Sequence, residues 1–246
     1  MDLVDRVALI TGGARMGEAI AQILGDRRCR VVLTWRHSKR AIEKAAINLR
    51  QRGIHASPLR CDLLKTASIE QMMRTVERRF GRLDILVNLA SIYETSEGSD
   101  PKRLRSWDKH LSSNARAAYE MTLSAARLMK RSGGGRVVHI SDWTSASGRP
   151  RYPGYSAYYV SKTAAKAVTE SLALELAPTV LVNAIAPGPL LPPTGLTARD
   201  HKAVRQATPL GRWGGAGEIA KAVLFLVETD FVTGETVRVD GGRHLT

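Results

Sequence analysis

Seven apolar runs of strand length recur along this chain, and the segments between them show the residue spacing of amphipathic helices. The runs read RVALIT, RVVLTW, IHASPLRC, LDILVNLA, RVVHIS, VLVNAIA and ETVRVD. Strands that alternate with helices form a parallel sheet, because each crossover helix packs back onto one of its faces. We therefore predict one α/β domain over residues 1–246, with a doubly wound parallel sheet of about seven strands and helices on both faces.

The composition is consistent with a single soluble domain. The chain has 246 residues, of which 43% are hydrophobic, and this suffices for one large core. It contains no apolar run of about twenty residues and opens with strand-forming sequence, so we expect neither a membrane partner nor a leader, and a cytoplasmic location. Cys29 and Cys61 lie far apart without metal-ligand spacing, which predicts free thiols and no metal site.

The net charge of +14 is unevenly distributed along the chain. Residues 25–53 hold nine Arg or Lys against two Asp or Glu, and their balance of +7 is half of the excess. Two interpretations stay open, a solvated helix face in a basic protein and an edge that binds phosphate. Such a charge also suggests nucleic acid as a binding partner, but composition alone does not establish it.

A glycine-rich turn joins the first predicted strand to the first predicted helix in ALITGGARMGEAIA. Gly12, Gly13 and Gly17 let the backbone approach a pyrophosphate, and the amides that open the helix, from Met16 onward, can receive its charge. Arg15 adds a positive group to this loop. The turn by itself is a weak signal, because a tight turn without a ligand has the same sequence.

The segment after the second predicted strand favours one dinucleotide over the other. An acidic residue at this place suits the ribose of NAD, whereas basic groups suit the 2′-phosphate of NADP. The sequence here is LTWRHSKR, which offers Arg36, His37 and Lys39 with no acid before Glu43. We therefore predict NADPH, and part of the excess charge acquires a local cause.

Tyr158 and Lys162 are four residues apart in YPGYSAYYVSKTAAKA and share one face of the predicted helix. An ammonium beside a phenol favours the phenolate, so we expect Lys162 to lower the pKa of Tyr158 towards working pH. Tyr158 would then be a usable proton donor. Such a pair also arises by chance, and a purely structural role stays open on this evidence alone.

Several motifs occur in family order over residues 6–243: the glycine loop, the basic turn, CDLL, LVNLAS, SSNARAAY, YYVSK, VNAIAPG and RVDGG. Together they resemble the short-chain dehydrogenase/reductase family. The resemblance implies a Rossmann-like domain, a homotetramer or homodimer, and hydride transfer from NAD(P)H to a small-molecule substrate. On this pattern Tyr158 is the acid, Lys162 binds the nicotinamide ribose, and Asn114 holds the water that links Lys162 to solvent.

The same resemblance implies further cofactor contacts. Asp62 and Leu63 would contact the adenine. The ribose side would be contacted by Asn88, Ala90 and Ser91. The nicotinamide would be contacted by Pro187, Gly188 and Leu190, with the Leu190 backbone at its carboxamide. The sequence departs from the family in four places: a glycine loop one residue short, Leu89 and Ser91 within the usual NNAG, and Pro192 where a Thr is common.

The largest departure concerns the catalytic serine. Counted from the strand RVVHIS, its position falls on Asp142, whereas counting back from Tyr158 gives Ser145. A loop absorbs an insertion more easily than a buried strand slips, because a shift of one residue turns every side chain over. We therefore place Asp142 in the site. A role for Asp142 as a turn or helix cap, with Ser145 as the hydroxyl, is the alternative.

An Asp at this position is typical of the pteridine reductase and dihydromonapterin reductase branch. That resemblance also rests on Arg15, on Tyr93 after LAS, where the branch has an aromatic that stacks on the pterin, and on the ending FVTGETVRVDGGRHLT. The hypothesis is NADPH-dependent reduction of a pteridine-like C=N bond, with Arg15, Tyr93, Asp142 and Tyr158 at the substrate. Asp142 would then orient Tyr158 or a water, with positive charge from Lys162 and Arg15 nearby.

Alternatives remain for several of these assignments. A carbonyl reductase acting on a ketone or quinone is the alternative function, and a protein that only binds NADPH or nucleic acid is a weaker one, because the Tyr158 and Lys162 pair is intact. Tyr93 could be a core aromatic, and we expect His139 to be structural because it lies within a strand. The Pro- and Gly-rich stretch at 189–209 predicts a substrate lid.

Overall fold

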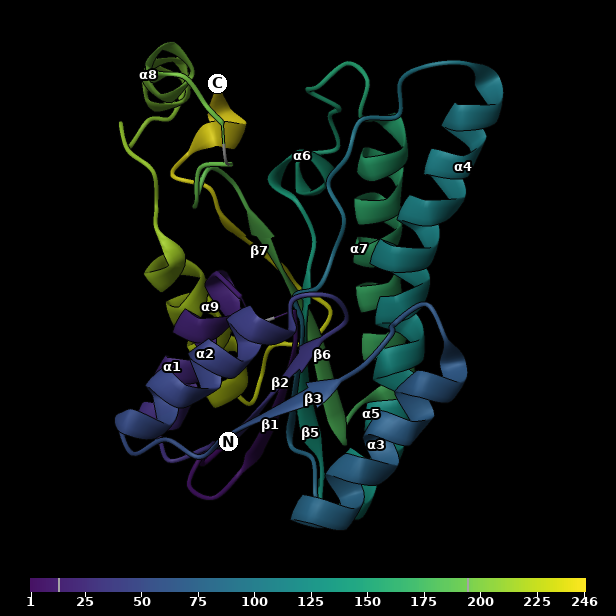
Figure 1. Cartoon of the computed structure of the whole chain (residues 1–246), viewed down its shortest axis with the longest axis vertical. Helices are drawn as coiled ribbons and strands as arrows, with labels where there is room; N and C mark the ends of the chain where they lie inside the picture. The colour runs from purple at the N-terminus through teal and green to yellow at the C-terminus, as the bar shows by residue number, and fades with distance from the viewer. Residues whose placement is uncertain (13, 194) are drawn as a thin grey trace.

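A computed structural model describes residues 1–12, 14–193 and 195–246. Gly13 of the predicted glycine loop and one residue of the predicted lid lie outside the described residues. The described chain folds around a single parallel sheet with helices on both faces, as Figure 1 shows. The predicted doubly wound α/β architecture is confirmed.

The sheet has seven strands in the order β3-β2-β1-β4-β5-β6-β7, and all the paired strands are parallel. The strands are β1 (Val7–Thr11), β2 (Arg30–Trp35), β3 (Ala56–Arg60), β4 (Ile85–Asn88), β5 (Gly135–Ile140), β6 (Val180–Pro187) and β7 (Thr236–Val239). The order reverses between β1 and β4, where Thr11 pairs with Asn88. Such a reversal opens a crevice at the carboxyl ends of the two strands, which is where open α/β sheets bind ligands.

The helices form a layer on each face of the sheet. The helical segments are α1 (Met16–Asp26), α2 (Lys39–Gln51), α3 (Thr66–Phe80), α4 (Asp100–His110), the π-helix η1 (Leu111–Arg116), α5 (Ala117–Arg131), α6 (Trp143–Ala146), α7 (Ser156–Leu176), α8 (Ala198–Gln206), α9 (Ala216–Glu228) and the 3-10 helix η2 (Arg243–Leu245). In Figure 1, α1, α2 and α9 lie on one side of the sheet and α3, α5 and α7 on the other. Each layer buries its own apolar cluster against the strands, because successive strand side chains point to opposite faces.

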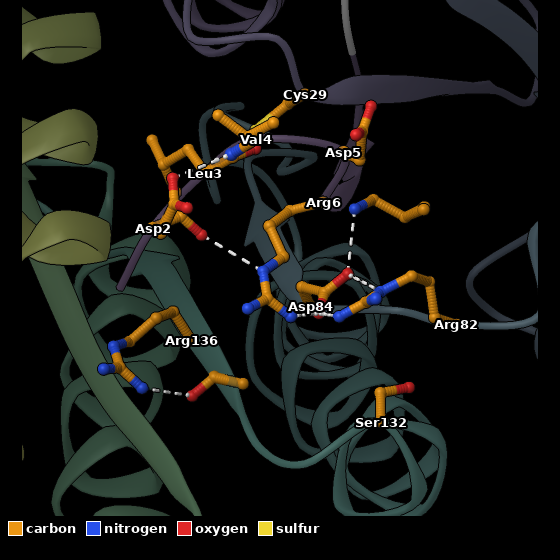
Figure 2. A network of polar contacts seen from close by, with 12 residues as sticks. Asp2, Leu3, Val4, Asp5, Arg6, Cys29, Arg82, Asp84, Ser132 and Arg136 are labelled. Atoms are coloured by element: carbon orange, nitrogen blue, oxygen red, sulfur yellow. Dashed lines mark hydrogen bonds and ion pairs between the residues drawn. The ribbon is translucent and has the colours of Figure 1, made fainter.

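A buried carboxylate ties β1 to β4 at the amino ends of these strands. Asp84 is fully buried, and its Oδ2 accepts the backbone N–H of Val7 at 2.9 Å. Arg82 donates to both carboxylate oxygens at 2.8 and 2.7 Å, and Arg6 Nη1 donates to Oδ1 at 3.2 Å. Figure 2 shows both guanidinium groups converging on Asp84. Because the charge is paired and hydrogen-bonded, it can be buried, and it fixes the two strands at the end of the sheet opposite the crevice.

Both cysteines are buried and free. Burial raises the pKa of the Cys61 thiol to about 11, so it is protonated and unreactive at neutral pH. No group of metal-binding side chains occurs among the residues that the structure describes. Over the same residues, no helix is both long enough and apolar enough to cross a bilayer.

Candidate active site

Asp142 lies just beyond the carboxyl end of β5 and begins the short helix α6. Its Oδ1 accepts the backbone N–H of Thr144 at 2.8 Å and the Thr144 hydroxyl at 2.5 Å. Its Oδ2 accepts the hydroxyl of Tyr158 at 3.0 Å. The sequence left a helix cap and a place in the site as alternatives. The structure shows the cap on Oδ1 and a contact with Tyr158 on Oδ2, so the two roles do not exclude each other.

Ser145 does not take the place of Asp142 beside Tyr158. Its hydroxyl donates to the Asp142 carbonyl at 2.8 Å and lies 2.8 Å from the Ser141 hydroxyl. Both contacts remain within the same buried turn. Of the two registers, the one counted from the strand identifies the side chain that contacts Tyr158.

Tyr158 and Lys162 lie on the buried face of α7, as their spacing predicts. The Lys162 ammonium donates to the carbonyl of Ile140, the last residue of β5, at 2.8 Å, and its Nζ lies 5.9 Å from the Tyr158 ring centroid. Burial lowers the pKa of Lys162 to about 8, while the nearby Asp142 carboxylate acts in the opposite direction. The ammonium is thus held at the carboxyl end of the central strands.

The expected lowering of the Tyr158 pKa is wrong for the protein alone. Burial raises the pKa of Tyr158 well above its ordinary value, and the charge of Asp142 and the hydrogen bond to its carboxylate raise it further. A negative carboxylate bonded to the hydroxyl opposes phenolate formation, and Lys162 is engaged with Ile140. Tyr158 is therefore a protonated donor in this arrangement.

Asn114 is placed by a π-helical turn between α4 and α5. Its Oδ1 accepts the N–H of Ile92 at 2.9 Å, and its Nδ2 donates to the Ile92 carbonyl and to the Ser161 hydroxyl, both at 3.0 Å. The side chain thus connects the segment after β4 to α7. A cavity of about 10 Å³, close to the space of one water molecule, is lined by Asn88, Asn114, His139 and Lys162 among others.

Tyr93 is half-exposed and is not a core aromatic. Its ring stacks on Tyr155 with centroids 4.7 Å apart and an interplanar angle of 17°, and it meets Tyr158 edge-on at 4.7 Å. Aromatic contacts continue from Tyr155 to Tyr152 at 6.3 Å and from Tyr152 to Trp143 at 6.4 Å. These five rings form an aromatic wall beside the Tyr158 hydroxyl. Of these rings, the sequence placed Tyr158 and Tyr93 at the substrate.

A pocket of about 310 Å³ opens at the carboxyl ends of β1, β2 and β4. Its lining includes seven residues that the sequence predicts at the cofactor: Gly12, Arg36, His37, Asp62, Leu63, Ala90 and Ser91. Sequence reasoning missed the other lining residues, and all of them except Thr34 adjoin a predicted site residue: Thr34, Trp35, Ser38, Cys61, Leu64, Ile92 and Ser113.

The pocket residues fit a dinucleotide in shape and in charge. Gly12 has φ +70°, and a Cβ built on it would lie 3.0 Å from Cα of Ala90, so a side chain there would fill the cradle. Arg36 is half-exposed at the rim, where its Nε pairs with Asp62 Oδ1 at 3.1 Å. The ion pair orients the guanidinium and leaves further N–H groups for an anion.

Part of the basic segment 25–53 is accounted for by these contacts. Arg36 lines the pocket, whereas Arg27 pairs with Glu228 and Lys39 with Glu43 on the surface. The explanation as a solvated surface therefore holds for Arg27 and Lys39, and phosphate binding at Arg36 stays a prediction. Surface pairs of this kind contribute about 0–1 kcal/mol to stability.

Arg15 and Met16 lie where α1 begins, at the predicted phosphate loop. Arg15 Nη2 donates to the Pro192 carbonyl at 2.7 Å, so it connects the glycine loop to the predicted lid. The expectation that Arg15 supplies positive charge near Asp142 stays a prediction. Gly17 is buried in the first turn of α1, where a Cβ would lie 3.0 Å from the Gly12 carbonyl oxygen.

The predicted nicotinamide residues follow the end of β6. The Leu190 N–H donates to the Gly188 carbonyl at 2.8 Å, and the Leu190 carbonyl accepts the Gly215 N–H at 2.9 Å. The N–H and the carbonyl of Leu190 are thus already hydrogen-bonded within the protein. A carboxamide that binds this backbone must share one of these two groups with its present partner. Gly188 is required by packing, because a Cβ would lie 2.5 Å from Asp240 Cβ, and Pro187 is the last residue of β6.

Comparison with known proteins agrees with this geometry. Residues 13–244 match the family model described as enoyl-(acyl carrier protein) reductase. A short-chain type dehydrogenase/reductase of Picea abies is 30% identical, over 97% of this chain and 92% of its own. A 3-oxoacyl-acyl-carrier-protein reductase of Aquifex aeolicus is 33% identical, over 98% of each chain. The structure of the NADPH-dependent 3-quinuclidinone reductase of Rhodotorula rubra superposes with a TM-score of 0.90 at 27% identity, covering 100% of this chain and 93% of that one.

The fold and the buried Tyr158 and Lys162 pair define an oxidoreductase with a nicotinamide-type cofactor crevice. The chain belongs to the short-chain dehydrogenase/reductase family.

Proposed function

We propose that this protein is an NADPH-dependent reductase of a small carbonyl compound. The arrangement that carries the proposal is the buried Tyr158 hydroxyl one helical turn from the buried Lys162 ammonium on α7. It keeps a protonated donor next to the aromatic wall. The names of the relatives support carbonyl chemistry, since they include a 3-oxoacyl-acyl-carrier-protein reductase and a 3-quinuclidinone reductase.

The cofactor would supply the hydride when it is bound. Gly12, Met16 and Gly17 would accommodate its pyrophosphate at the start of α1, with Asp62 and Leu63 at the adenine. Arg36 and His37 would bind a 2′-phosphate, since both are exposed basic groups at the rim of the pocket. Ala90 and Ser91 would face the ribose side, with Asn88 behind them and Pro187, Gly188 and Leu190 towards the nicotinamide.

Tyr158 would donate the proton that the substrate oxygen requires. Its hydroxyl would turn from the Asp142 carboxylate to the carbonyl oxygen as the substrate enters, and the wall would hold the substrate in place. Lys162 would bind the nicotinamide ribose and, when charged, stabilise the resulting phenolate. Asn114 would support a proton path to solvent beside Lys162. The segment 189–209 would close over the substrate as a lid, with Arg15 bonded to it.

A second candidate is reduction of a pteridine-like C=N bond, and the Asp142 carboxylate favours it. A carboxylate accepts hydrogen bonds from the ring N–H and amino groups of a dihydropterin, whereas a ketone has no donor to offer it. Tyr93 is half-exposed and could stack on a heterocycle next to Tyr158.

The deciding experiment compares NADPH consumption with ketones, quinones and a dihydropterin under identical conditions. Tyr158→Phe should lose activity by about a hundredfold or more while NADPH binding, measured by titration, stays close to that of the unmodified protein. Retained activity would remove Tyr158 as the acid. Turnover of the dihydropterin alone would replace the first proposal by the second. The prediction of a homodimer or homotetramer is tested on the same preparation by light scattering.

A further inference from the structure

The guanidinium groups of two arginines lie over the ring of Trp143, the first residue of α6. Trp143 directly follows Asp142, and only 5% of it is exposed. The guanidinium carbon of Arg151 lies 5.6 Å from the Trp143 ring centroid, and that of Arg243 lies 5.7 Å from it. The fold brings them together from the loop before α7 and from the C-terminal helix η2, which contacts α6.

Among the described residues, these two cations lack the acidic partner that some other part-buried arginines have. Arg82 and Arg136, for example, each pair with a carboxylate. In the ranges 1–12, 14–193 and 195–246, neither Arg151 nor Arg243 forms an ion pair, and Arg151 Nε and Arg243 Nη1 are buried without an acceptor. Two like charges over one ring repel each other, and the attraction of each for the indole face compensates only in part.

Two carboxylates beside these residues in the chain, Asp142 and Asp240, are already engaged, and Asp240 accepts from the Gly242 N–H and from His244. Asp142 influences the pKa of Tyr152, but its two oxygens are bonded to Thr144 and Tyr158. Tyr152 connects the two ends of the wall, because its ring centroid lies 6.3 Å from that of Tyr155 and 6.4 Å from that of Trp143. The arginine pair therefore lies at the end of the aromatic wall away from Tyr158, against the ring of Trp143, which directly follows Asp142.

We infer that Arg151 and Arg243 form a subsite for a negatively charged group, a carboxylate or a phosphate, on the substrate whose carbonyl is reduced beside Tyr158. This rests on the proposed carbonyl reductase function. An anion here neutralises the repulsion between the two guanidinium groups and receives charge-assisted hydrogen bonds from their remaining N–H groups. Anionic substrates are thus preferred over neutral ones of the same shape.

The test uses matched pairs that differ in charge: levulinate with methyl levulinate, and dihydroxyacetone phosphate with dihydroxyacetone. In the unmodified enzyme kcat/KM is about tenfold or more higher for the anion of at least one pair, and the pair that responds identifies the anion. Arg151→Gln and Arg243→Gln lower this ratio by at least about fivefold. Arg151→Lys keeps part of it, because the charge remains.

Arg149→Gln is the matched control, because Arg149 is an exposed basic residue of the same loop that does not lie over Trp143. In Arg149→Gln, the ratio of kcat/KM for the anionic substrate to that for the neutral one stays within about twofold of the ratio in the unmodified enzyme. Salt screens an exposed charge, so removing one changes the long-range attraction of an anion only weakly. If the ratio of kcat/KM for the anion to that for the neutral substrate is the same in all variants, the subsite is wrong. If methyl levulinate is still reduced in that case, the proposed carbonyl reductase function is unaffected. An equal loss in Arg149→Gln also overturns it.

Binding separates failure of the subsite from failure of the function. Levulinate and inorganic phosphate are titrated calorimetrically into the enzyme loaded with NADP+. If no ketone is reduced but one anion binds, and binding is lost in Arg151→Gln and Arg243→Gln, the subsite stands without the carbonyl reaction. If neither anion binds the unmodified enzyme and both pairs give ratios near one, the inference is wrong.

Discussion

The carboxylate of Asp142 joins the start of α6 to the hydroxyl of Tyr158, which donates to Oδ2 at 3.0 Å while Oδ1 caps the helix. The hydrogen bond from the Thr144 N–H fixes the Asp142 carboxylate. The oxygen that accepts from Tyr158 is therefore held in place by the backbone as well as by packing. Stability and activity at this position are therefore separable, since each depends on a different oxygen.

Asp142→Ser and Asp142→Ala test that separation. Alanine removes the cap and should lower the free energy of unfolding by about 1 kcal/mol, whereas serine keeps a cap and should cost a few tenths at most. Urea unfolding measures both. If carbonyl reduction is the function, Asp142→Ser should raise ketone kcat/KM several-fold, because it offers a hydroxyl donor. If a C=N bond is reduced, the same change should lower dihydropterin turnover at least tenfold.

A smaller stability loss in Asp142→Ala than in Asp142→Ser would contradict the cap. Unchanged kinetics with every substrate in both variants would show that Asp142 is only structural. The pair therefore also decides between the two candidate functions.

The fold could be predicted from the sequence because burial on both faces imposes apolar runs on the central parallel strands, such as β1 and β4. The place of Asp142 followed from the same constraint, since a buried strand cannot slip by one residue without inverting its side chains. The raised pKa of Tyr158 could not be predicted from its spacing to Lys162. It depends on burial and on a carboxylate sixteen residues earlier in the chain, which only the tertiary structure brings to the hydroxyl.

The arginines over Trp143 were equally out of reach of the sequence. Arg151 and Arg243 are far apart in the chain, and no motif assigned either of them to the site. The contact of Arg15 with Pro192 was missed for the same reason, because it joins two loops whose separation no periodicity fixes. Local patterns predict elements, and contacts between loops follow only from how the elements pack.

Arg36→Leu should weaken NADPH binding much more than NADH binding. Arg36 is the half-exposed guanidinium that Asp62 orients at the rim of the pocket, and it would meet the 2′-phosphate that NADH lacks. Loss of a charge-assisted contact corresponds to about a tenfold to hundredfold rise in Kd. Fluorescence titration with each dinucleotide measures it, and Arg40→Leu, an exposed basic residue on α2, serves as the control. Equal weakening of both dinucleotides would argue against a 2′-phosphate site at Arg36.

His139 should make the protein sensitive to acid. It is fully buried between the hydroxyls of Thr122 at 2.8 Å and Thr169 at 2.9 Å, and burial, followed by the charge of Lys162, lowers the pKa of His139 to about 4. The unfolded chain takes up this proton near the ordinary value of 6.5, so stability present above that pH is lost as pH falls towards 4. The loss from this group is about 3 kcal/mol at most.

His139→Leu isolates that contribution from the carboxylates that titrate in the same range. Thr122 and Thr169 keep hydrogen bonds to the carbonyls of Ala118 and Ala165, so the variant leaves no unpaired hydroxyl. Urea unfolding at several values between pH 4 and 7 should give a shallower decline than in the unmodified protein. Parallel curves would mean that His139 does not change its protonation on unfolding.

Asp84→Asn should destabilise the protein without changing the site. Asp84 is fully buried with Arg6, Arg82 and the Val7 N–H as partners, and removing its charge leaves two guanidinium groups without a counterion. The free energy of unfolding should fall by about 3 kcal/mol. Glu77→Gln breaks an exposed pair with Arg131 and should cost less than about 1 kcal/mol. The Kd for NADPH should be the same in both variants, because Asp84 lies at the opposite end of the sheet from the crevice. Equal stability losses in the two variants would show that burial gives the Asp84 network no added strength.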